Sequence, residues 1–304
     1  MTASDHVRWL SDPKLQSPAV VAAFHGWNDA ADASSTAMRT LISAWNAEPL
    51  AEIDPEEFTD FATIRPSVRL EDGVHRSIVW PKVTLWHAST PGTDVILILG
   101  PEPSLKWRLF TEQIISVAAK YDVSMVLTLG ALLADVSHRG DVQILRTAND
   151  QATIDRFDLQ RSRYEGPTGI IGVLHDACSQ SSIPSASLWA AVPAVASQVP
   201  SPKAASALIA KAGEIIGTPA PLAALHNQVV AYDHKVEEMI EDDDDLREYV
   251  ERLESLGEDA FGIDNPNQLE FDFVDSSDDD EDDEDNVQSI ADEVEQFLRD
   301  QDGR

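Results

Sequence analysis

Four short, largely apolar runs constrain the fold of this 304-residue chain more than any other feature. Glycine or proline follows each run within two residues. The runs are residues 19–24, 95–99, 124–129 and 186–192. A short run that is apolar at successive positions is typical of a strand buried on both faces. Since helix-spaced apolar residues such as Ala33, Ala37 and Leu41 separate the runs, the pattern predicts an α/β fold with a mostly parallel sheet and flanking helices.

Weaker patterns predict further strands and helices. Residues 68–70 and 77–80 flank an Asp-Gly step and predict a hairpin, and residues 83–87 and 142–146 predict two more strands.

Residues 166–179 fit a strand or a helix. Helical spacing of the apolar residues, with Pro167 in the first turn, favours the helix and leaves His175 as a partly exposed surface residue.

The chain is expected to become helical after residue 200. Ser201-Pro202 predicts a helix start and Gly217 its end. Apolar stripes over residues 222–239 and 246–256, interrupted by four consecutive aspartates, predict two more helices. These two helices are expected to form an antiparallel hairpin or a lobe on the α/β core.

Charge divides the chain further. The net charge is -32, and residues 237–304 contain 29 acidic and 4 basic residues. A run of carboxylates without apolar residues cannot bury enough surface to fold. The predicted division is an α/β core at 1–200, a helical lobe at 201–260, an acidic disordered linker at 261–286 and a short amphipathic helix at 287–304. Because so short a helix is marginal alone, we expect it to need a surface of this chain or of a protein partner.

The composition argues against several classes of protein. The acidic charge argues against nucleic-acid binding, which needs a basic surface. The longest apolar stretch has nine residues, whereas a membrane span needs about 20. The N-terminus lacks a signal-peptide pattern, and a single cysteine, Cys178, suits a reducing compartment, so we expect a cytoplasmic protein without membrane association. We find no standard catalytic motif and no metal-ligand spacing, so we predict no cofactor and no metal.

Polar loops follow the predicted strands, where ligands of parallel sheets bind. Asp29, Glu102 and Asp135, together with His138, are candidates for an acid/base site. The start of the helix near Pro167 is a candidate anion site. The structural interpretation is that the glycines provide tight strand exits while Asn28 and Asp29 cap a helix, and we favour it. The residues of the candidate ligand pocket are Trp27, Asn28, Asp29, Gly100, Glu102, Gly130, Asp135, His138, Gly166 and Thr168.

Five segments in a fixed order resemble a known family. They are AFHGWNDA at 23–30, LGPEP at 99–103, TLGALLADV at 128–136, YEGPTG at 164–169 and IPSASLWAAVP at 183–193. Together they resemble the bacterial branch of the proteasome assembly chaperone 2 family, over about residues 15–256. The resemblance implies a fold similar to purine nucleoside phosphorylase with a helical lobe, and a trimer or other homo-oligomer. Eukaryotic members act as chaperones for proteasome assembly, and the resemblance implies no enzymatic activity.

One departure from the family concerns docking on the proteasome. Some relatives dock through a C-terminal hydrophobic-Tyr-any tail, whereas this sequence ends in QDGR. Direct docking by that tail is therefore not expected. The resemblance and the missing catalytic motifs predict a non-catalytic interaction or assembly-chaperone-like protein. The alternatives are a small-molecule-binding enzyme acting on a nucleoside- or phosphate-like ligand at the strand exits, and a structural oligomer without a ligand.

Overall fold

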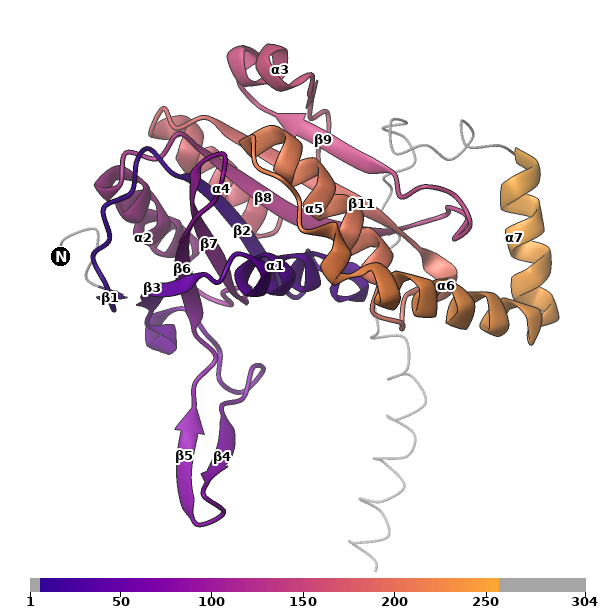
Figure 1. The fold of residues 1–304 in the computed structure, drawn as a ribbon, viewed down its shortest axis with the longest axis horizontal. Coiled ribbons are helices and arrows are strands. Elements are labelled where there is room, and N and C mark those ends of the chain that lie inside the picture. Colours follow the sequence, from indigo (N-terminus) through magenta and orange to yellow (C-terminus); the bar gives the residue numbers. More distant parts are fainter. Residues whose placement is uncertain (1–5, 257–304) are drawn as a thin grey trace, which may run out of the picture. The chain divides into compact units, whose positions relative to one another are not determined.

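A nine-stranded sheet forms the centre of the computed structural model, which describes residues 6–256 (Figure 1). The strand order is β1-β3-β6-β7-β2-β8-β11-β9-β10. Its four middle strands are parallel to one another. They are β7 (Asp94–Pro101), β2 (Ala19–His25), β8 (Met125–Ala134) and β11 (Ser185–Pro193). Each predicted apolar run thus lies in one of these four strands.

The flanks of the sheet are largely antiparallel, so the predicted mostly parallel sheet is corrected to a mixed one. Only four of the eight neighbouring pairs are parallel. The connection between β6 and β7 is too short for a crossover and forces an antiparallel pair. The flanking strands are β1 (Val7–Trp9), β3 (Glu48–Ile53), β6 (Val83–Ser89), β9 (Ile144–Ala148) and β10 (Gln160–Arg161).

Helices cover both faces of the sheet, which explains why β2 is apolar at every position from Ala19 to Phe24. Ala19, Val21 and Ala23 pack in the cluster that contains α1 (Ala33–Ala44) and α5 (Pro202–Ile216). Val20, Ala22 and Phe24 point to the other face, toward α2 (Trp107–Lys120) and α4 (Ile170–Gln180). A strand between two layers of helices needs apolar side chains on both sides.

Local signals set some of the helix ends. Ser201 caps α5 by accepting a hydrogen bond from the Ala204 amide, and Gly217 ends that helix with a φ of 72°. Asp150 caps α3 (Gln151–Phe157), a helix that the sequence patterns did not predict. The helix predicted over 166–179 is present as α4, but it begins at Ile170, so Pro167 precedes the helix instead of lying in its first turn.

The last two described helices, α6 (His226–Glu241) and α7 (Asp244–Leu256), have a small core of their own. Tyr232, Val236 and Ile240 of α6 meet Val250 of α7 there. The two helices run in clearly different directions, so the predicted antiparallel hairpin is wrong, and the alternative, a lobe on the core, stays a prediction (Figure 1). The predicted domain boundaries stay a prediction, and the predicted linker and terminal helix lie outside the described residues. Within residues 6–256, no helix has the length and apolar character needed to cross a membrane.

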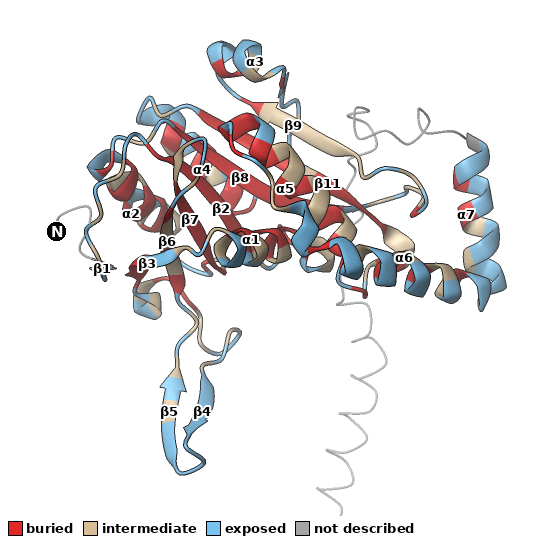
Figure 2. Ribbon diagram, in the orientation of Figure 1, coloured by how far each residue is buried: buried red, intermediate tan, exposed pale blue. Residues whose placement is uncertain are grey.

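The predicted hairpin forms a separate two-stranded sheet. Strands β4 (Ser67–Glu71) and β5 (His75–Val79) pair in antiparallel fashion and extend away from the large sheet (Figure 2). Every residue of β4 is exposed. Four short 3₁₀ turns complete the described elements, at Ala30–Asp32, Pro55–Glu57, Ala194–Ala196 and Leu222–Ala224.

His175 is buried, which corrects its prediction as a surface residue. Its imidazole lies between α4 and the sheet, with Nε2 2.9 Å from Thr128 Oγ1 and Nδ1 2.9 Å from Ser185 Oγ. The Thr128 hydroxyl in turn donates to Ser187 Oγ at 3.0 Å. Burial lowers the pKa of His175 to about 4, because the charged imidazolium would lose its hydration. The neutral ring therefore links α4 to β8 and β11.

The buried His175 predicts a loss of stability in mild acid. The unfolded chain takes up a proton below about pH 6.5, whereas the folded chain does so only near pH 4. The free energy of unfolding of the wild type should therefore fall, relative to that of His175→Gln, by roughly 2 kcal/mol between pH 7 and pH 5. Urea unfolding of both proteins at each pH measures this difference. Parallel curves for the two proteins would contradict a neutral buried imidazole.

Candidate functional site

The loops that follow β2, β7 and β8 meet at the carboxyl edge of the parallel strands. The Glu102 amide donates to the His25 carbonyl at 2.9 Å, which ties the loop after β7 to the end of β2. The Ala131 amide of β8 donates to the Asn28 carbonyl, also at 2.9 Å. Gly26 begins the first loop with a φ of 119°, a conformation that side-chain-bearing residues rarely adopt. The backbone thus joins the loop after β2 to the loop after β7 and to β8, while the predicted pocket stays a prediction.

Glu102 is the centre of this edge. Its Oε1 accepts a hydrogen bond from Asn28 Nδ2 at 2.9 Å and another from the Ile170 amide at 2.7 Å. Gly169 makes this approach possible, because a Cβ there would lie 2.6 Å from Asn28 Oδ1 and 2.8 Å from Glu102 Oε1. The carboxylate therefore joins the loops after β2 and β7 to the first turn of α4.

This arrangement changes the interpretation of the predicted anion site. The first amide of α4 already has a carboxylate of the same chain, placed where the helix dipole favours negative charge. Gly166 and Thr168 lie in the loop before the helix, and the Thr168 hydroxyl is 3.4 Å from the Gly169 carbonyl. An internal carboxylate thus occupies the position that an external anion would take at Ile170.

The Asp29 side chain accepts hydrogen bonds from the N-terminus of α1. Its Oδ1 accepts hydrogen bonds from the Ser34 amide at 2.7 Å, the Ser34 hydroxyl at 2.6 Å and the Ser35 amide at 3.0 Å. The predicted capping role is present, although a 3₁₀ turn separates Asp29 from the helix. Burial opposes ionisation, but His25 and the bonds from Ser34 and Ser35 outweigh it and lower the pKa of Asp29. The carboxylate is therefore held charged at the helix start.

Gly100 and Gly130 permit close packing. A Cβ at Gly100 would lie 2.6 Å from Val83 Cα on the neighbouring strand. A Cβ at Gly130 would lie 2.6 Å from the Trp189 ring, which crosses that position of β8. Both glycines thus have a structural role, but not the predicted one. Each lies within its strand, so neither provides a tight strand exit.

Asp135 and His138, the other two candidates, contact the helical lobe. Asp135 accepts a hydrogen bond from the Tyr249 hydroxyl of α7. The His138 Nε2 atom lies 2.7 Å from Glu237 Oε2 of α6. Lys203 of α5 donates to the His138 carbonyl at 2.6 Å. The groups that bond Asp135 and His138 therefore come from α5, α6 and α7. The Asp29 carboxylate instead bonds α1, and the Glu102 carboxylate bonds Asn28 and α4.

Arg139, beside them, is the residue that sequence reasoning missed. Its guanidinium bonds Glu237 of α6 at 2.7 Å and Glu254 of α7 at 3.1 Å. The hydrogen bond from Arg139, with a further one from His138, lowers the pKa of Glu237 to about 2. No local pattern signals this role, because the partners lie 98 and 115 residues further along the chain.

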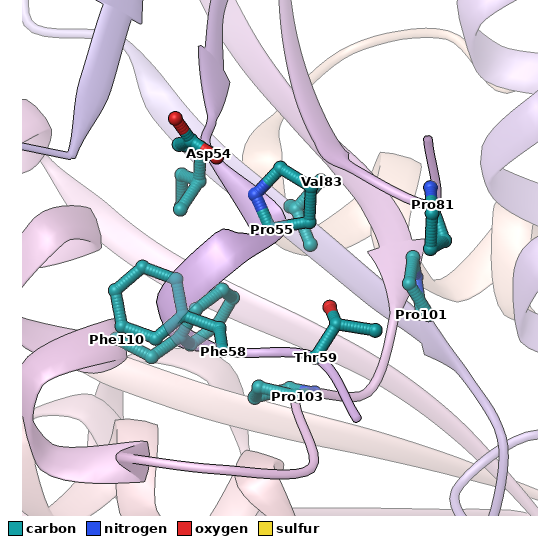
Figure 3. A pocket seen from close by; sticks show the side chains of 10 residues that line it. Asp54, Pro55, Phe58, Thr59, Pro81, Val83, Pro101, Pro103 and Phe110 are labelled. Carbon is teal, nitrogen blue, oxygen red and sulfur yellow. The ribbon is translucent and has the colours of Figure 1, made fainter. Parts of the chain in front are cut away.

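Two small cavities lie close to the predicted site. One is lined by Phe58, Phe110, Pro101 and other residues beside the end of β7 (Figure 3). The other is lined by His138, Lys203 and their neighbours. Each has a volume of about 10 Å³, room for about one water molecule. Within the described residues, no group of three His, Cys, Asp or Glu side chains is arranged to hold a metal ion.

Large apolar side chains are exposed at the same edge. Trp27 follows β2, Leu105 follows β7 and Leu133 lies near the end of β8, with exposed fractions of 43%, 48% and 50%. Exposed apolar groups gathered on one side of a protein often mark a surface for other proteins.

Comparison with known proteins identifies the family of this chain. Residues 23–240 match the sequence profile of the PAC2 family. The chain belongs to the PAC2 family. Comparison with curated proteins gave no significant match.

Several solved structures are similar to this PAC2 chain. A PAC2 family protein from Streptomyces avermitilis has 39% identity and a TM-score of 0.71, over 77% of this chain and 99% of that one. The Mycobacterium tuberculosis proteasome-assembly chaperone homologue Rv2125 has 43% identity and a TM-score of 0.70, over 76% and 99%. The Pyrococcus furiosus proteasome activator PbaB has 14% identity and a TM-score of 0.63, over 76% and 97%, and shows a shared fold alone.

The role of Glu102 gives a stability prediction. Glu102→Ala leaves Asn28 Nδ2 and the Ile170 amide without their acceptor, and should lower the free energy of unfolding by about 1–3 kcal/mol. Glu102→Gln keeps an oxygen at Oε1 and loses only the charge, so its cost should be about 0.3–1 kcal/mol. Thermal and urea unfolding of both variants test this order. Equal losses would show that the acceptor at this position does not join the loops.

Proposed function

We propose that this PAC2 family chain is a non-catalytic, assembly-chaperone-like protein that binds other proteins at the carboxyl edge of its sheet. One observation carries the proposal. The acidic side chains of this edge are engaged in helix capping and lobe contacts, while the apolar side chains beside them are exposed. Such an edge suits protein contact better than acid/base chemistry, which needs a titratable group free to reach a substrate.

The comparisons support the same proposal. The similar protein from Mycobacterium tuberculosis is described as a proteasome-assembly chaperone homologue. We therefore take the proteasome, or subunits on the way to it, as the partner to test first. Self-association into a trimer or another homo-oligomer, a cytoplasmic location and a fold like that of purine nucleoside phosphorylase, all expected from the sequence, are parts of this proposal.

An assembly assay tests the function. The purified chain is mixed with proteasome α- and β-subunits of its own cell, and complete particles are followed on native gels. We expect faster assembly with the wild type, and a loss of this effect in Leu105→Asp and Leu133→Asp, because a carboxylate at an apolar contact is costly to bury. Leu222→Asp is the matched control, since Leu222 is also exposed but lies away from this edge.

Two results of this assay would count against the proposal. If the wild type leaves the assembly rate unchanged, the chaperone-like role is wrong for this partner. If Leu105→Asp, Leu133→Asp and Leu222→Asp all behave like the wild type in an assay that responds to the chain, the carboxyl edge is not the binding surface.

A second candidate function is the binding of a small polar ligand at the predicted pocket residues. The observation that favours it concerns two buried oxygens. Within the described residues Asn28 Oδ1 has no hydrogen-bond partner, and Asp29 Oδ2 meets only the His25 Nδ1 atom, 3.7 Å away. Buried polar atoms of this kind usually meet water or a ligand. Adenosine and inorganic phosphate are suitable probes. Binding should raise the melting temperature of the wild type, and less so that of Asn28→Ala, whereas unchanged melting with both probes would count against a nucleoside- or phosphate-like ligand.

A further inference from the structure

The β4–β5 hairpin, with its flanking residues 65–82, forms an arm with one apolar face. In the strand register Val68 pairs with Ile78 and Leu70 with Arg76, so these four side chains share a face. Val68, Leu70 and Ile78 are each more than half exposed. An isolated two-stranded hairpin is marginal in water, and this one exposes the apolar side chains that would stabilise it. The arm therefore has a face that lacks a cover within the described part of its own chain.

The charge of the arm is opposite to that of the chain. Residues 65–82 contain four basic and two acidic side chains, a net charge of +2, in a chain of net charge -32. Lys82 pairs with Glu52 of β3, while Arg69 and Arg76 are exposed along the hairpin. The only charged group on the apolar face is Arg76. A surface that covers this face should therefore be acidic and partly apolar.

Helices α6 and α7 provide such a surface. Residues 226–256 contain 11 acidic and 3 basic side chains, a net charge of -8. Glu248 and Glu251 of α7 are exposed, and Val230 of α6 is 58% exposed. Within one copy, the arm extends away from the sheet in a direction that leads away from α6 and α7 (Figure 1).

We propose that the arm of one copy docks on the acidic face of α6 and α7 of a second copy. The inference rests on the self-association included in the proposed function, and it names the two surfaces involved. The apolar face of the arm would be buried against α6, with Arg76 of the same face near the carboxylates of α7. Because the two surfaces differ, the contact is head-to-tail and generates a ring when the rotation between copies closes.

A charge-swap experiment tests the pairing of these surfaces. The arm variant is Arg76→Glu, which reverses the one charge on the apolar face, and the helix variant is Glu248→Lys/Glu251→Lys. In each variant alone, like charges face each other, so association should weaken on the order of 100-fold at low salt. In an equimolar mixture every contact between unlike variants joins opposite charges, so the two variants should associate with each other. A ring with an odd number of copies keeps at least one contact between like variants and should close less readily than that of the wild type. Light scattering coupled to size-exclusion chromatography measures the mass of each sample.

The control is Lys14→Glu/Arg163→Glu, which reverses two exposed charges outside both surfaces and should leave association unchanged. Circular dichroism and thermal unfolding confirm that each variant is folded. A monomeric wild type would overturn the self-association and the arm contact together. Oligomers that persist in both variants would overturn the arm contact alone. Monomeric variants that stay apart on mixing would overturn the pairing of the arm with α6 and α7.

Discussion

A single carboxylate, that of Glu102, holds the carboxyl edge of the sheet in one arrangement. It accepts hydrogen bonds from the loop after β2 and from the first turn of α4, segments that are 74 and 68 residues away in the chain. Asp29 acts in the same way on α1. Each carboxylate is satisfied by the amide groups of a helix start, where a negative charge is favoured. The edge that usually receives a ligand in a parallel sheet is thus stabilised by the protein's own acids.

Burial explains which strands could be predicted from the sequence. Strands β2 and β7 lie between two layers of helices, so nearly every residue is apolar and the pattern is unmistakable. The direction of the neighbouring strands could not be predicted in this way. Residue patterns report which faces are buried, whereas the mixed sheet follows from short connections on its flanks, such as that from Ser89 to Asp94. The mostly parallel sheet was therefore wrong, although its four central strands were right.

The candidate site was predicted in part. Asp29 and Glu102 were identified because they follow strands, but the sequence contains no sign that the partner of Glu102 is the amide of Ile170. His175 was misplaced for a different reason. It lies four residues after Ile171 and three before Cys178, on the buried face of α4, yet counting apolar residues alone excludes a histidine from that face. A neutral imidazole between two hydroxyls behaves as a core residue, and its helical position was the available signal.

The distribution of charge explains how the protein can expose large apolar side chains without aggregating. A chain with a net charge of -32 repels its own copies over distances of about a Debye length, roughly 10 Å at ordinary salt. This repulsion lets the protein expose Leu70 and Ile78 on an arm, and Leu105 and Leu133 at the sheet edge, without general aggregation. A partner must then carry a charge that complements the charged residues around each exposed apolar side chain. Because the arm is basic and the sheet edge adjoins acidic loops, the two apolar surfaces favour partners of different charge, as the proposed self-association and the proposed chaperone-like role require.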